Sequence, residues 1–178
     1  MPGNENSVID RPLANEDRML GLWAGRLGDD DIVVVRIAAE SPEILRVDIG
    51  VYAEDAGIAR YRAARTRIGD RDILELTETD ASSRAGAGAK MDLARRFFVA
   101  YAFDGDKRFS VYLQNELETP LEKAVEQGRL PGRSEDRDGN KRILVTAPTD
   151  ILRGFIAATP NVFGNPPVVL TKMPPVGK

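Results

Sequence analysis

The chain has no cysteine and no histidine among its 178 residues. This excludes disulfides, and it excludes the Cys–His and Ser–His–Asp arrangements of nucleophilic catalysis. Zinc, copper and haem centres nearly always take a ligand from one of these two residue types, so the sequence predicts neither a metal nor a cofactor. Any chemistry would have to use carboxylates, lysine, tyrosine, serine or a bound oxygen-ligated cation.

An excess of one charge and long apolar runs are also missing. The 25 basic residues nearly balance the 28 acidic ones, so no global positive field predicts a nucleic-acid partner. No apolar run approaches the roughly 18 residues that a transmembrane segment needs. The first residues have no apolar core like that of a signal peptide, so the sequence as written predicts the cytoplasm. A periplasmic or envelope-tethered location would follow only if a leader had been removed.

The length is typical of one domain. Residues 1–17 are polar and contain Pro2 and Pro12, so we expect a flexible N-terminal tail. Residues 18–178 are then expected to form a single domain with a helical insert at about 115–140.

Alternation of apolar and polar residues is the main pattern after the tail, and it predicts half-buried strands. The turn signal Asp104–Gly105 and other short polar links favour antiparallel neighbours. The apolar rows are Val33, Val35 and Ile37; Leu45, Val47, Ile49 and Val51; Leu74 and Leu76; Phe97, Val99, Tyr101 and Phe103; and Phe109, Val111 and Leu113, with further strand-like runs at 142–146 and 167–173.

Two segments carry helical signals instead. Residues 119–128 have Thr119 as a candidate N-cap, Pro120 at the first helical position and Gly128 as a stop. Residues 149–159 group four apolar side chains on one face, namely Ile151, Leu152, Phe155 and Ile156. We therefore predict an all-β fold of eight to nine antiparallel strands with two short helices. Closing the sheet into a barrel would hide its edges.

Trp23 is the only tryptophan, and it stands at the start of the first apolar run in Gly21–Leu22–Trp23. This stretch resembles the G-x-W signature that opens the first strand of lipocalins and related calycin barrels. The resemblance implies that Trp23 closes one end of an antiparallel barrel beneath a basic residue, here Lys172 or Arg153. It also implies a helix before the last strand, where 149–159 lies. An ordinary core position for Trp23 is the alternative.

A lipocalin-like barrel implies noncovalent binding of a small, largely apolar ligand inside it. An eight-stranded barrel either holds one small ligand or is filled by its own side chains, and the sequence leaves both open. The predicted ligand-binding residues are Val35, Val47, Ile49, Tyr61, Val99, Tyr101 and Val111.

The strand 57–69 carries four arginines, of which Arg60 and Arg62 share one face and Arg65 and Arg67 share the other. A pair that pointed into the barrel would anchor a carboxylate or phosphate, and Arg60 and Arg62 are the predicted anchor. The alternative is a solvated face paired with acidic neighbours.

Three further sequence patterns partly match known binding or catalytic motifs. Residues 134–142 have calcium-loop spacing but lack the required glycine and glutamate, so we predict a polar turn. The GAGAK stretch at 86–90 lacks phosphate-loop spacing and falls in a predicted loop at 79–90. The acidic cluster at 29–31 would be needed for a carboxylate-based hydrolase.

Three functions therefore compete. The first is noncovalent binding of a small, largely apolar ligand, and it favours a protein that is not an enzyme without excluding an enzyme. The second is a scaffold with a filled core that contacts a protein partner through 115–140. The third is the hydrolase.

Overall fold

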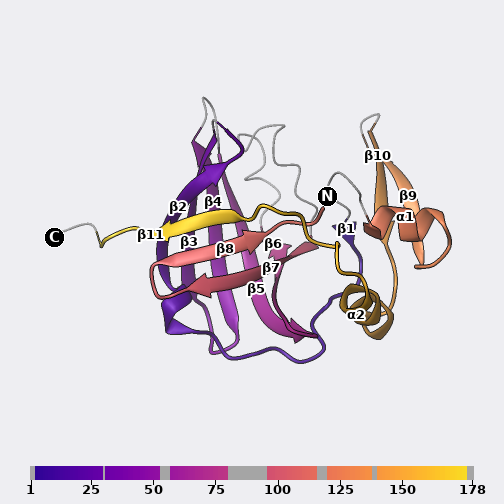
Figure 1. Cartoon of the computed structure of the whole chain (residues 1–178), viewed down its shortest axis with the longest axis horizontal. Coiled ribbons are helices and arrows are strands. Elements are labelled where there is room, and N and C mark those ends of the chain that lie inside the picture. Colours follow the sequence, from indigo (N-terminus) through magenta and orange to yellow (C-terminus); the bar gives the residue numbers. More distant parts are fainter. Residues whose placement is uncertain are drawn as a thin grey trace.

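The computed structural model describes residues 3–29, 31–52, 57–79, 96–115, 120–137 and 140–175. Eight strands form a closed antiparallel barrel in the order β11-β2-β3-β4-β5-β6-β7-β8 (Figure 1). Its strands are β2 (Gly21–Leu27), β3 (Asp31–Ala39), β4 (Ile44–Tyr52), β5 (Ile58–Ile68), β6 (Arg71–Glu78), β7 (Arg96–Asp104), β8 (Arg108–Tyr112) and β11 (Val168–Lys172). The predicted all-β class, antiparallel pairing and barrel closure are confirmed.

The other elements lie outside the barrel wall. They are β1 (Gly3–Asn4), η1 (Asp17–Met19), α1 (Pro120–Glu126), β9 (Gly132–Arg137), β10 (Asn140–Val145) and α2 (Thr149–Ala158). The strands β1, β10 and β9 form a three-stranded sheet, and with α1 and α2 they make a second unit beside the barrel (Figure 1).

The barrel closes where β11 pairs antiparallel with both β8 and β2. At this seam Leu170 lies opposite Gly25. A Cβ on Gly25 would lie 2.4 Å from the carbonyl oxygen of Val169, which no side chain can tolerate. The close approach of the first and last barrel strands therefore depends on a glycine at this position.

The local turn signals are confirmed where the structure describes them. Gly105 has φ +68° in the β7–β8 connection, and Gly128 has φ +68° just after α1. These left-handed conformations favour glycine and end the preceding element. Thr119, residues 80–90 of the predicted loop with the GAGAK stretch, and Asp30 lie outside the described residues.

The helix α2 begins at Thr149, as predicted. Leu152 and Ile156 are fully buried against the barrel, whereas Ile151 is 47% exposed. The apolar face is therefore narrower than the four-residue group that the sequence predicted, because Ile151 lies to one side of the contact line.

We expected a polar turn in the segment 134–142, and residues 138 and 139 at its centre lie outside the described residues. Most of it belongs to a hairpin in which β9 pairs antiparallel with β10, and the pair lies outside the barrel. The sequence of β9, GRSEDR, has no apolar alternation, so its pairing cannot be read from periodicity. The insert is correspondingly larger than 115–140 and contains strands as well as helices.

The N-terminal segment differs from the flexible tail that its composition suggested. β1 pairs parallel with β10, and Val8 is fully buried. Further along, Leu13 forms an isolated bridge with Arg65, and Asn15 donates its backbone N–H to the carbonyl of Pro42. Backbone hydrogen bonds hold this segment on the barrel, and a count of apolar residues does not reveal them.

The barrel wall separates two hydrophobic cores. The inner core contains Trp23 and the inward rows of β3, β4 and β7, as the alternation predicted. The outer core lies between the barrel and the second unit and contains Phe98, Leu152 and Ile156. We call the end of the barrel at Trp23 the lower end, and the end beside the β2–β3 and β4–β5 connections the upper end.

Candidate functional site

Trp23 lies at the lower end of the inner core, and we call this end of the core the floor. Trp23 is fully buried, and its indole Nε1 donates a 2.8 Å hydrogen bond to the carbonyl of Met19 in η1. Its ring packs at centroid distances of 5.6 Å from Phe109 and 6.3 Å from Phe103. The polar end of the indole is thus hydrogen-bonded to η1, and its apolar body packs in the inner core.

Lys172 supplies the cation over this ring. Its Nζ lies 5.2 Å from the Trp23 centroid and donates to the carbonyl of Arg18 at 3.1 Å. Gly21 has φ +129°, and a Cβ there would lie 3.2 Å from Cε of Lys172. The other candidate, Arg153, is on the outer side of the wall, where it donates to carbonyls including that of Val8 at 2.9 Å.

The buried Arg65 connects the segment just before η1 to the lower end of the barrel. Nε of Arg65 donates a 2.6 Å hydrogen bond to the hydroxyl of Tyr101. The other guanidinium nitrogens donate to the carbonyl of Ala14 and to the carboxylate of Glu16. Burial raises the pKa of Tyr101 against the opposing effect of Arg65, so this hydroxyl stays neutral at ordinary pH.

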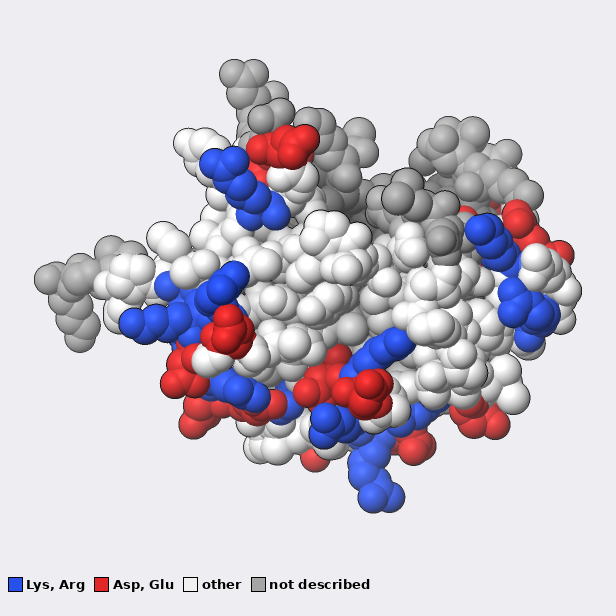
Figure 2. Space-filling model, in the orientation of Figure 1, with Lys and Arg blue, Asp and Glu red and all other residues white. Residues whose placement is uncertain are grey.

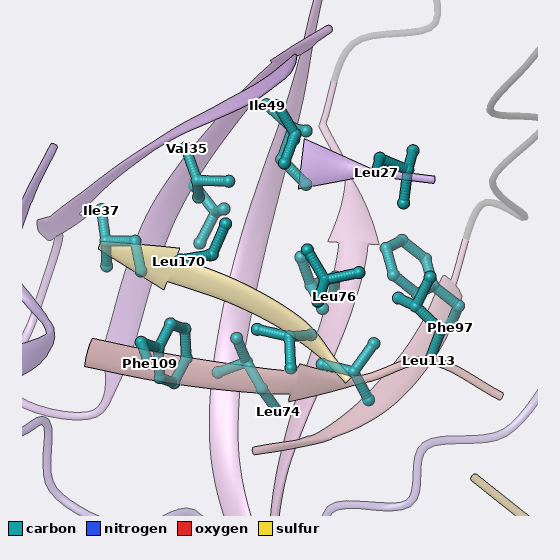
Figure 3. Close-up of a pocket in the computed structure, with 15 residues that line it drawn as sticks. Leu27, Val35, Ile37, Ile49, Leu74, Leu76, Phe97, Phe109, Leu113 and Leu170 are labelled. Carbon is teal, nitrogen blue, oxygen red and sulfur yellow. The ribbon is translucent and has the colours of Figure 1, made fainter. Parts of the chain in front are cut away.

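Above the floor lies a cavity of about 80 Å³ (Figure 3). In Figure 3 the labelled side chains enter the cavity from strands on opposite sides of the barrel. Every residue that lines it is apolar: Leu27, Val33, Val35, Ile37, Val47, Ile49, Leu74, Leu76, Phe97, Val99, Phe109, Val111, Leu113, Val168 and Leu170. A cavity without polar groups offers nothing to hold ordered water and favours apolar contents.

The predicted ligand-binding residues divide into two sets. Val35, Val47, Ile49, Val99 and Val111 line the cavity. Two tyrosines are buried elsewhere in the inner core: Tyr61 packs edge-on against Phe97 at 5.5 Å, and Tyr101 bonds Arg65 in the floor. The structure therefore places the aliphatic part of the predicted set together and keeps both hydroxyls out of the cavity lining.

The predicted anion anchor does not point into the barrel. Arg60 and Arg62 are exposed on the outer face of β5, and Arg62 is paired with Glu40. The inward face of this strand holds Tyr61 and Ala63, and at its far end Arg65. The residues alternate between the two faces as predicted. The buried arginine, however, is Arg65, which lies on the face opposite to that of Arg60 and Arg62.

Sequence reasoning also missed a buried carboxylate on the outer side of the wall. Glu75 accepts hydrogen bonds from the backbone N–H of Val8 at 2.6 Å and from the hydroxyl of Ser7 at 2.8 Å. Burial raises the pKa of Glu75, and these two bonds and the nearby Arg96 oppose the rise. No local signal marks Glu75, because the groups that bond it, Ser7 and Val8, are distant in the sequence.

The predicted acidic cluster at 29–31 lies at the β2–β3 connection, and its Asp30 is outside the described residues. Asp29 is exposed beside the β2–β3 connection. Within the described ranges, no group of three or more acidic side chains is arranged to hold a metal ion. On the face in Figure 2, acidic and basic side chains are interspersed along the lower border, with uncharged residues across the middle.

No helix in the described part of the chain is long and apolar enough to cross a membrane. No family model, curated protein or solved structure matches the chain. The barrel, its strand directions and its single closing seam are compatible with the lipocalin architecture.

Proposed function

We propose that the barrel binds a slender apolar molecule, or the hydrocarbon tail of an amphiphile, in the cavity above Trp23. The observation that carries this proposal is a cavity of about 80 Å³ with an entirely apolar lining. Transfer of hydrocarbon from water into such a space is favourable by about 25 cal/mol per Å² of apolar surface removed from water.

The size and lining of the cavity limit the ligand. Pockets for drug-sized molecules span about 300–1,000 Å³, and an engineered cavity of about 150 Å³ accepts benzene. A cavity of about 80 Å³ suits a narrow chain better than a fused-ring compound. Since no lining residue can pair with a polar atom, a polar headgroup would remain outside the cavity.

We further propose that the barrel is lipocalin-like. Two features support this: Lys172 lies over the ring of Trp23, and a helix precedes the last barrel strand. This likeness concerns the arrangement of the elements in the fold. Ligand binding is tested separately, with variants of the cavity lining.

The experiment compares two neighbouring valines on β3. Val35 lines the cavity, whereas Val34 is absent from its lining and lies opposite Gly50, where a Cβ would meet open space. Val35→Phe fills the cavity, and Val34→Phe makes the same chemical change on the outer face. Titration with a fluorescent fatty-chain probe measures affinity, and far-ultraviolet circular dichroism checks the fold.

We expect saturable binding by the natural chain and by Val34→Phe, and at least a tenfold loss of affinity in Val35→Phe. Absence of saturable binding by the natural chain overturns the proposal. Equal affinities of the two folded variants overturn it as well, because the probe would then bind outside the barrel.

A further inference from the structure

Three large apolar side chains are exposed together at the upper end of the barrel. The exposed fractions are 45% for Ile32, 81% for Tyr52 and 53% for Ile58. They come from three adjacent strands, β3, β4 and β5, next to the connections between those strands. We call these three residues the rim cluster.

The strand register makes the rim cluster continuous. Ile32 lies directly opposite Tyr52, and Ile58 lies opposite Gly50, two residues before Tyr52 on the same face. Side chains at such opposite and diagonal positions are within contact range on a sheet. Gly50 adds no side chain, and a Cβ there would meet nothing within 4 Å, so the position opposite Ile58 on β4 is open.

The rim cluster and the cavity share one stretch of wall. Val33 follows Ile32 on β3 and lines the cavity, and Ile49 precedes Gly50 on β4 and also lines it. The same short strand segments therefore present apolar residues to the cavity on one side and to solvent on the other.

Charges of both signs border the rim cluster. Arg26 lies opposite Ile32, and the next outward row across β3, β4 and β5 is Arg36, Asp48 and Arg60. Asp29 is exposed at the β2–β3 connection. Arginine beside an apolar patch can extend its charge to lipid headgroups, whereas the aspartates prevent strong attraction to anionic lipid alone.

We propose that the rim cluster docks the upper end of the barrel on the surface of a lipid bilayer, so that an apolar ligand passes between the bilayer and the cavity. The transfer step rests on the proposed function, and the docking step does not. Tyrosine with isoleucine is a composition suited to the membrane interface, where the phenol ring lies at headgroup level.

A second copy of the chain fits the rim cluster less well. The three side chains together expose on the order of 400 Å², about half of the ~800 Å² that each partner contributes to a standard protein interface. Insertion into a bilayer needs no matching surface, and its strength increases with the apolar area that enters the interface.

The experiment measures co-sedimentation of the full chain with phosphatidylcholine vesicles. The test variant is the double substitution Tyr52→Thr with Ile58→Thr, since threonine retains a high strand propensity. The matched control is Ile151→Thr, which removes an isoleucine that is 47% exposed on α2. Probe binding in lipid-free buffer is measured for all three proteins, together with the sedimentation coefficient.

We expect the double variant to partition about tenfold less and the control to match the natural chain. All three proteins should bind the probe equally. Absence of vesicle binding by the natural chain, or an equal loss in Ile151→Thr, overturns the docking. A dimer in lipid-free buffer that dissociates in the double variant assigns the rim cluster to a second copy and also overturns it. If the natural chain sediments with vesicles but does not bind the probe, the proposed function is overturned and the docking is not.

Discussion

The inner and outer faces of the barrel wall carry two cores that are held together in different ways. The inner core consists mainly of apolar side chains from consecutive strands, and near the floor it includes the hydrogen-bonded pair Arg65 and Tyr101. The outer core joins the barrel to the N-terminal segment and the second unit, and there apolar contacts alternate with hydrogen bonds from buried polar groups.

The difference follows from the backbone hydrogen-bonding groups that the side chains on each face must pair. On the inner face the sheet has already paired the backbone, so side chains only need to exclude water. On the outer face the N-terminal segment has little sheet pairing of its own, so side chains must bond its backbone. Glu75 accepts from Val8 N–H, Arg153 donates to the Val8 carbonyl, and Thr149 donates to the Ser7 carbonyl at 2.8 Å.

The largest effect is expected where the inner core is opened at its floor. Trp23→Ala removes a fully buried indole, together with its ring contacts with Phe103 and Phe109 and its hydrogen bond to Met19. We expect a loss of about 3–5 kcal/mol in the free energy of unfolding, measured by urea titration followed by circular dichroism. The control Tyr52→Ala, at an 81% exposed aromatic, should change it by less than about 0.5 kcal/mol. Similar losses in both would show that Trp23 is not the floor of the core.

A comparable truncation in the outer core should weaken the second unit without disturbing the floor. Leu152→Ala empties a fully buried site on α2 and should cost about 2–4 kcal/mol. Trp23, the only tryptophan, reports on the inner core, so its native fluorescence should persist while limited proteolysis between 120 and 163 accelerates. Ile151→Ala is the matched control. A shifted tryptophan spectrum in native Leu152→Ala would show that the two cores are one cooperative structure.

A single methyl group at the closing seam tests the barrel itself. Gly25→Ala places a Cβ 2.4 Å from the carbonyl oxygen of Val169 and should destabilise the fold by about 1–3 kcal/mol. Gly50→Ala, also within a strand but in open space, should be neutral or stabilising by up to about 1 kcal/mol. Thermal unfolding compares the two, and hydrogen exchange should show faster exchange in β11 only for Gly25→Ala. Equal behaviour would argue against a tight β2–β11 seam.

The smallest effect is a pH dependence that belongs to the outer core. Because burial raises the folded-state pKa of Glu75 above its ordinary value of 4.5, the folded protein binds the proton more tightly than the unfolded chain. Its stabilising contribution is complete below pH 4.5 and is lost as the pH rises through the folded-state pKa. Relative to Glu75→Gln, the natural chain should therefore lose stability with rising pH. Parallel stability profiles of the two proteins would contradict this.

Much of the inner core could be predicted from the sequence. The alternating rows of Val35, Val47 and Val99 point to the cavity because side-chain direction along a strand reverses at every residue. The anion anchor was misplaced because two faces of β5 each carry a pair of arginines, and alternation does not say which face is inside. Only the neighbours of the strand decide that.

The hairpin β9–β10 and the docked N-terminal segment could not be predicted in this way. β9 is polar at nearly every position, and the N-terminal segment contributes few apolar residues. Their order comes from backbone pairing with distant residues, such as Gly3 with Leu144, and such pairing leaves no periodic signal in either segment.

The sequence alone determined the strand pattern of the barrel, the turns at Gly105 and Gly128, the two helices and the absence of histidine and cysteine chemistry, because these depend on local propensity and residue type. The tertiary structure alone decided that Lys172 covers Trp23, that Arg65 is the buried cation, that Glu75 loses its solvent and that an apolar space remains above the floor. These features depend on which distant segments meet, and packing free energy summed over the whole chain selects those meetings.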